Sequence, residues 1–134
     1  MDYVFRLTYG SDLRQAIEQF CQKQKIRSAV IVTVVGCLYE ARIRLADGKT
    51  IVHYADNYEI VSLTGTLSED GSHMHISLSD REGRVIGGHM CYGCLVNTTA
   101  EVAIRSLDGN YRLSRQYDQQ TGYDELVVVK EVSE

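Results

Sequence analysis

A strictly alternating segment followed by a turn constrains the fold of this chain most. Polar and apolar residues alternate from His73 to Ser79: His73, His75, Ser77 and Ser79 against Met74, Ile76 and Leu78. Successive side chains of a strand point to opposite faces, so this period of two predicts a strand with one polar and one buried face. Asp80 to Arg84 is a turn sequence in which Gly83 can adopt a positive φ. Together these features predict an antiparallel hairpin whose second arm spans 85–91.

The register of this hairpin decides whether a third histidine, His89, joins His73 and His75. A three-residue loop places His75 opposite His89. It also places His73 opposite Cys91, on the diagonal from His89. Directly opposed Cβ atoms lie about 4.5–5.5 Å apart and diagonal ones about 7–8 Å, so the imidazoles can reach a common ion. A two-residue loop instead sends His89 to the apolar face, because a one-residue slip reverses every side chain; a bulge at 87–88 would restore the alignment.

Three imidazoles on one strand face form a candidate metal site. Imidazole is the commonest side-chain ligand of zinc, and three protein ligands leave a fourth coordination position open. We therefore expect His73, His75 and His89 to hold zinc or another divalent metal ion. The same spacing allows an alternative, in which three neutral histidines lie on a solvent-exposed face without a metal.

Size, charge and cysteine content narrow the class of protein. The 134 residues suit one domain with a single core, and no linker or repeat divides them. The net charge of −4 gives no overall sign of nucleic-acid binding, which typically needs a basic surface. No apolar run approaches about 18 residues and no secretory signal is visible, so we expect no membrane association and a cytoplasmic location. The four cysteines then stay reduced, and a lone Cys91-Tyr-Gly-Cys94 indicates no zinc knuckle.

The chain predicts one helix and a succession of strands. Ser11 or Asp12 can cap a helix that continues to about Gln24, with apolar residues at helical spacing. Short turns connect the expected strands, so the sheet should be mostly antiparallel. We expect an α+β fold, a single domain of about six to eight strands covered by one or two helices. The expected strands are 28–35, 38–45, 50–54, 58–67, 72–80, 85–91, 94–107, 111–117 and 125–130.

The β-branched run 28–35 is apolar enough to be buried on both faces. A sheet of this kind has edges that need covering, and oligomerisation is one way to cover them.

Short segments in a fixed order carry a resemblance to a known family. The segments are Gly10 to Leu13, Ile26 to Ala29, Val35-Gly36, Tyr58 to Gly65, His73 to Asp80, Gly87 to Met90 and Thr121 to Leu126. Over nearly its whole length the chain resembles the prokaryotic members of the plants and prokaryotes conserved (PPC) domain family, which implies one PPC-like domain over 1–134. The resemblance implies a single α/β domain around an antiparallel sheet, assembled as a homotrimer. In some prokaryotic members a histidine cluster binds a metal, usually assigned as zinc, at the positions of His73, His75 and His89.

The resemblance also implies an association with DNA, but this chain lacks one feature of the plant proteins. In plants the PPC domain follows an AT-hook in nuclear DNA-binding proteins and mediates contacts with other proteins. The hook reads the minor groove through an Arg-Gly-Arg core flanked by proline. This chain has neither proline nor Arg-Gly-Arg, so it offers no segment for arginine insertion into the minor groove.

Three functions are consistent with these observations. The first is a homotrimeric, DNA-associated regulatory protein that binds DNA weakly and non-specifically, or binds protein partners. The second is a metal-dependent enzyme acting on a small substrate, with Glu59 as the candidate general base, Asp80 as a poorer one and no partner for Ser77 as a nucleophile. The third is a non-catalytic metal- or ligand-sensing trimer. A fourth protein ligand such as Cys91 would argue against catalysis, and an open position would support it.

Overall fold

The strands follow one another through short turns, as their sequence pattern predicts. The computed structural model describes residues 1–131 of the chain. These residues form one helix, α1 (Leu13–Lys23), and eight strands. The strands are β1 (Asp2–Thr8), β2 (Ser28–Arg44), β3 (Ile51–Ser68), β4 (Gly71–Ser79), β5 (Val85–Met90), β6 (Leu95–Ser106), β7 (Tyr111–Asp118) and β8 (Tyr123–Lys130). No helix within 1–131 has the length and apolar character needed to cross a membrane.

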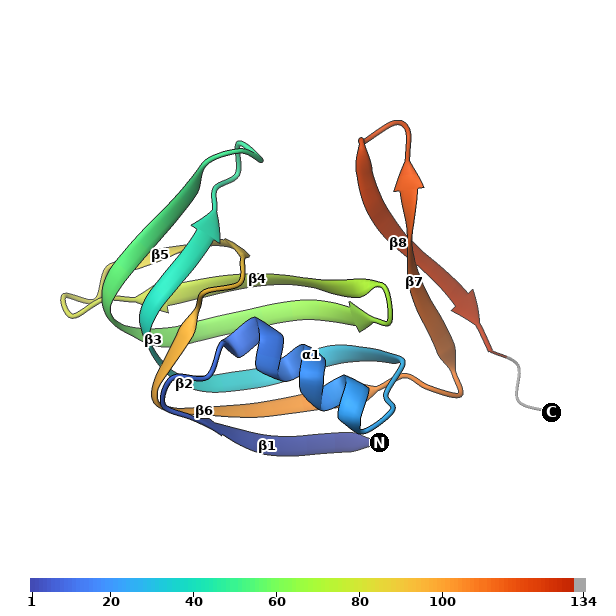
Figure 1. Cartoon of the computed structure of the whole chain (residues 1–134), viewed down its shortest axis with the longest axis horizontal. Helices are drawn as coiled ribbons and strands as arrows, with labels where there is room; N and C mark the ends of the chain where they lie inside the picture. The colour runs from blue at the N-terminus through green and yellow to red at the C-terminus, as the bar shows by residue number, and fades with distance from the viewer. Residues whose placement is uncertain (132–134) are drawn as a thin grey trace.

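Six of the strands form one antiparallel sheet in the order β1-β6-β2-β3-β4-β5. The far end of β2 pairs in addition with β5, where Arg44 lies opposite His89, so the sheet curls on itself. β7 and β8 form a separate two-stranded hairpin that stands apart from the main sheet (Figure 1). The expected α+β fold with a mostly antiparallel sheet is confirmed.

The helix α1 covers one face of the sheet over β1, β6 and β2 (Figure 1). Asp12 caps it, since one carboxylate oxygen accepts from the backbone N–H of Gln15 at 3.0 Å. Leu13 and Ile17 are fully buried in the core beneath the helix. The ring of Phe20 stacks on Phe5 of β1, with centroids 3.8 Å apart. This packing fixes which face of the sheet is the core face.

The opposite face of the sheet is largely uncovered. Val4, on β1, is 77% exposed, and Val32 and Val35, on β2, are 49% and 55% exposed. The prediction that 28–35 is buried on both faces is therefore wrong for the single chain, because within 1–131 no second layer packs on this side. An exposed valine surface of this kind is a candidate contact between molecules.

Bulges make the long strands continuous where the sequence predicts breaks. Gly36 has φ +154°, and a Cβ there would collide with the carbonyl oxygen of Thr99 on β6. The pairing of β2 with β6 shifts by a bulge between Gly36 and Cys37, so 28–35 and 38–45 form one strand. The expected strands 50–54 and 58–67 likewise merge into β3.

Candidate metal centre

The β4–β5 hairpin has the register that brings the histidines together. His75 lies opposite His89, and Ser79 lies opposite Val85. The turn is closed by the N–H of Asp80, which donates to the carbonyl of Arg84 at 2.9 Å. Gly83 has a φ of +80°, as the three-residue loop requires. The two-residue loop does not occur, and the pairing of β4 with β5 contains no bulge.

The expected pairing of His73 with Cys91 is not formed. β5 ends at Met90, and the N–H of Cys91 donates to the carbonyl of Arg42 on β2 at 3.0 Å. β2 thus replaces β4 as the partner of this segment. The Cys91 thiol is within 3.9 Å of the carbonyl of His89 and is not part of the histidine cluster.

The three imidazoles converge on one point. The Nε2 atoms of His73 and His75 are 3.2 Å apart, and one ring nitrogen of each histidine lies within 4.8 Å of the other two. Zinc–nitrogen bonds of about 2.0–2.1 Å in a tetrahedron give a nitrogen–nitrogen separation of about 3.3 Å. The first pair already has this spacing, and the third ring needs to approach by at most about 1.5 Å. The residues present therefore fit a zinc-sized ion.

Burial keeps two of the histidines, His73 and His89, in the form that binds metals. Burial, and after it the positive charge of Arg44, lower the pKa of His89 to about 4. Burial also lowers the pKa of His73, with a smaller contribution from His75. Neutral imidazoles carry the free lone pair that a metal needs, so these two rings are ready to coordinate at neutral pH.

Two buried polar atoms at this site have no hydrogen-bond partner within 1–131: Nδ1 of His89 and Nε of Arg44. An unpaired buried polar atom costs about 1–3 kcal/mol, and such atoms in a folded protein call for a ligand, an ion or water. An ion coordinated by the His89 ring would supply one of the missing partners.

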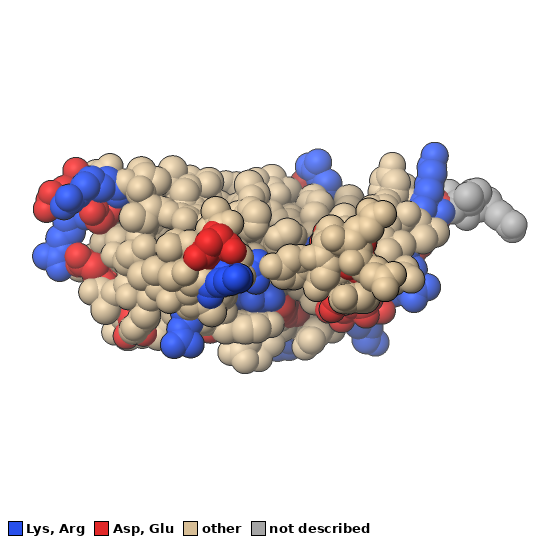
Figure 2. All heavy atoms as spheres, turned by 90° about the horizontal axis from the view of Figure 1, so that it is seen from above, with Lys and Arg blue, Asp and Glu red and all other residues tan. Residues whose placement is uncertain are grey.

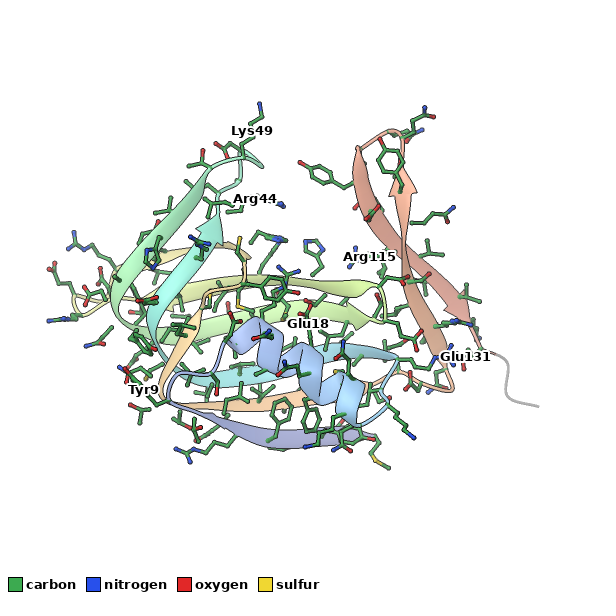
Figure 3. All side chains as sticks on the ribbon, in the orientation of Figure 1. Tyr9, Glu18, Arg44, Lys49, Arg115 and Glu131 are labelled. Carbon is green, nitrogen blue, oxygen red and sulfur yellow. The ribbon has the colours of Figure 1, made fainter. Side chains whose placement is uncertain are left out.

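A cavity of about 320 Å³ opens beside His73 and His89. Arg44 from β2 and Arg115 from β7 point toward this space from opposite sides (Figure 3). Arg115 is held by a hydrogen bond of 3.0 Å from its guanidinium to the hydroxyl of Thr66. The charged residues of the lining are Arg14, Arg44, Asp70, Arg115, Asp124 and Glu125. The sequence did not indicate the arginines, because only the tertiary fold brings them to the histidines.

The proposed general base lies elsewhere. Glu59 is opposite Ser79, four residues along β4 from His75, or about 13 Å at the usual rise of a strand. Glu59 and Asp80 line a different cavity, of about 530 Å³. Ser77 shares the histidine face, and its hydroxyl is bonded to that of Ser62 at 2.6 Å. No reaction step at the histidines can be assigned to these residues.

A curled antiparallel sheet with one covering helix and a histidine cluster defines a class of small α+β proteins with a candidate metal site. Within it, the family model described as the Plants and Prokaryotes Conserved domain matches residues 1–108. The chain belongs to this family, as its resemblance in sequence implied.

Similar proteins of known structure extend the match beyond these residues. A hypothetical protein from Salmonella cholerae-suis is 34% identical with a TM-score of 0.93, and the match covers 98% of this chain and 95% of that one. A protein from Archaeoglobus fulgidus described as metal-containing is 28% identical with a TM-score of 0.76, over 95% and 93% of the two chains. Further structures at 22% identity, described as candidate DNA-binding proteins, show the shared fold alone.

Among curated proteins, the chain matches part of a much longer one. It is 42% identical over 129 residues to the bifunctional protein GlmU of Synechococcus sp. (strain JA-3-3Ab). The match covers 96% of this chain and 20% of that protein, so the chain spans about a fifth of the length of its curated relative.

Proposed function

We propose that this protein binds one divalent metal ion, most simply zinc, through His73, His75 and His89. The convergence of three ring nitrogens within 4.8 Å of one another carries the proposal. The metal-containing relative from Archaeoglobus fulgidus, which shares the fold at 28% identity, supports it. A bound ion of this kind supplies Lewis acidity and lowers the pKa of a bound water.

The surroundings of the histidines favour a site that is open to a ligand. Within 1–131, no cysteine or carboxylate joins the histidines as a fourth metal ligand. The cavity adjoins two of the three rings, and a small molecule could enter it. Since Glu59, the expected general base, lines a different cavity, we propose a ligand-responsive regulatory site ahead of a metal-dependent enzyme.

Metal analysis of purified protein tests the proposal directly. We expect one ion per chain in the wild type and almost none in His75→Ala. His53→Ala is the matched control, because His53 lies on β3 next to Glu40, with its Nε2 3.5 Å from that carboxylate, and is not part of the cluster. Equal metal content in wild type and His75→Ala would reject the site.

We also propose that the protein is a homotrimer, the assembly that its resemblance to the family implies. The support here is the exposed valine face on β1 and β2, which a second copy could bury. Sedimentation velocity at micromolar concentration should give a species of three chains. A single-chain species over the whole concentration range would contradict it.

DNA association is the alternative regulatory role. Its support is the fold shared with the candidate DNA-binding proteins. Figure 2 shows Lys and Arg interspersed with Asp and Glu over the face in view, without a continuous basic surface. The affinity for DNA should therefore be weak and should fall steeply as the salt concentration rises, because neutralisation of the DNA phosphates would supply the binding energy. Fluorescence anisotropy with a duplex at two salt concentrations tests this, and no binding at low salt would end the alternative.

We further propose a cytoplasmic location. The four cysteines Cys21, Cys37, Cys91 and Cys94 are free thiols, which suits a reducing compartment. Cell fractionation tests it.

A further inference from the structure

We propose that the cavity beside the histidines binds a small oxyanion, a carboxylate or a phosphate. The guanidinium of Arg44 would pair with the negative charge of the oxyanion, and one oxygen of the oxyanion would coordinate the metal ion. The inference rests on the proposed metal site and names the class of ligand that would complete it. It starts from Arg44, which the metal site itself does not use.

Arg44 is a charged group that forms no ion pair with the carboxylates around it. It is half-buried, its Nε is fully buried and unpaired, and it forms no ion pair within 1–131. It also lies opposite His89 in the β2–β5 pairing, so the strand register holds it beside the third ring. A partly buried guanidinium that lacks an anion is costly, and an anion entering the cavity would offset this cost.

The other side of the cavity holds a second arginine that suits an anion. Arg115 enters from β7 and keeps part of its guanidinium free, since the bond to Thr66 uses one terminal nitrogen. Tyr123 of β8 lies 6.0 Å from the guanidinium carbon of Arg44, measured to the ring centroid. Its hydroxyl reaches Gly48 in the turn between β2 and β3, so the tyrosine spans the two hairpins.

Charge balance favours an anion once the metal is bound. Three arginines line the cavity together with three carboxylates, Asp70, Asp124 and Glu125, so the lining is formally neutral. The imidazoles are neutral as metal ligands, so they add no charge to the site. A divalent ion then leaves an excess of two positive charges, which an oxyanion reduces or cancels.

The geometry of the guanidinium explains why an oxyanion fits better than a halide. Its planar fork donates two parallel hydrogen bonds to a pair of oxygens, as carboxylates and phosphates present. Arg14, the third arginine, is already engaged with Ser72 and with the carbonyl of Met90, so Arg44 and Arg115 are the free donors.

Cobalt(II)-loaded protein tests the inference, because the visible absorption of cobalt reports changes in its ligands without any assay of activity. The full chain is titrated with sodium acetate and with sodium phosphate, against sodium perchlorate at equal ionic strength. We expect a saturable band shift with at least one anion, and the stronger responder identifies the ligand class. The Arg44→Gln protein should retain its cobalt, and its dissociation constant for the anion should be at least about tenfold higher than that of the wild type.

Arg81→Gln is the matched control, since Arg81 lies in the β4–β5 turn and pairs with Asp56. It should bind the anion as the wild type does. Arg115→Gln serves as a second variant should Arg44→Gln fail to fold. A cobalt-loaded wild type that responds to neither anion, or an Arg44→Gln protein that binds as tightly as wild type, would overturn the inference alone. A wild type that takes up no cobalt would reject the metal site and the inference together.

Discussion

Among single residues, His89 is the histidine whose surroundings change its chemistry most. It lies on β5 between β4 and the end of β2, where burial and Arg44 depress its pKa to about 4. The ordinary pKa of an unfolded histidine is about 6.5, so the folded chain takes up a proton less readily than the unfolded chain. The metal-free protein should therefore be most stable above pH 6.5.

The lowered pKa of His89 predicts how the stability of the metal-free protein depends on pH. In protein stripped with a chelator, stability should fall progressively as the pH drops from about 6.5 toward 4, because the unfolded chain binds the proton first. Urea unfolding at several pH values measures this slope. His89→Gln should have a shallower slope over the same range. Identical slopes in the two proteins would show that His89 is not the titrating group.

Gly87 controls the spacing of the two strands that carry His75 and His89. A Cβ at this position would collide with the carbonyl oxygen of Ile76 on β4. We expect Gly87→Ala to lower the free energy of unfolding by about 1–3 kcal/mol and to reduce metal content, because β5 must move away from β4. Chemical denaturation and elemental analysis measure the two effects. Ser79→Ala, on the same hairpin, should retain metal, and full metal content in Gly87→Ala would contradict the argument.

At the level of elements, the β7–β8 hairpin is attached to the body by a few specific bonds. Ser28 at the start of β2 is 1% exposed, and its hydroxyl accepts from the N–H of Leu113 on β7 at 2.9 Å. Arg115 adds its backbone N–H, which donates to the carboxylate of Asp70 at 3.0 Å. The hairpin thus depends on polar contacts more than on a shared core.

Ser28→Ala should loosen this attachment. The substitution leaves the buried N–H of Leu113 without an acceptor, which costs about 1–3 kcal/mol. Amide hydrogen exchange should become faster in residues 111–130 and stay unchanged in β6. Unchanged exchange in the hairpin would show that other contacts suffice to hold it.

Local sequence patterns predicted the helix, most of the strands and the histidine cluster. The features that the sequence did not predict depend mainly on contacts between residues far apart in the chain. The alternation around His75 and the turn at Gly83 predicted the hairpin register, because both signals lie within a few residues of each other. The strand β1 was not predicted, although Tyr3, Phe5 and Leu7 alternate toward the core. Arg44 and Arg115 could not be found, since they are 71 positions apart in the sequence and line one cavity only in the folded chain.

For the whole molecule, the exposed valines determine what assembly is expected. Val35→Lys should dissociate the proposed trimer, because a charge replaces an apolar contact, and Glu101 opposite it on β6 can pair with the lysine in the single chain. Val129→Lys on β8 is the matched control, since Val129 is 54% exposed and lies outside the main sheet. Sedimentation velocity should show smaller particles for the first variant only. A trimer unaffected by Val35→Lys would place the contact elsewhere.

The separate hairpin of β7 and β8 has an implication for how relatives can diverge. The family match ends at residue 108, whereas Arg115, Tyr123, Asp124 and Glu125 all come from this later segment. A few replacements there could alter what is recognised next to the histidines and leave the scaffold and the histidine cluster intact. If the proposed ligand site exists, homologues with the same three rings could thus recognise different ligands by varying only residues of β7 and β8.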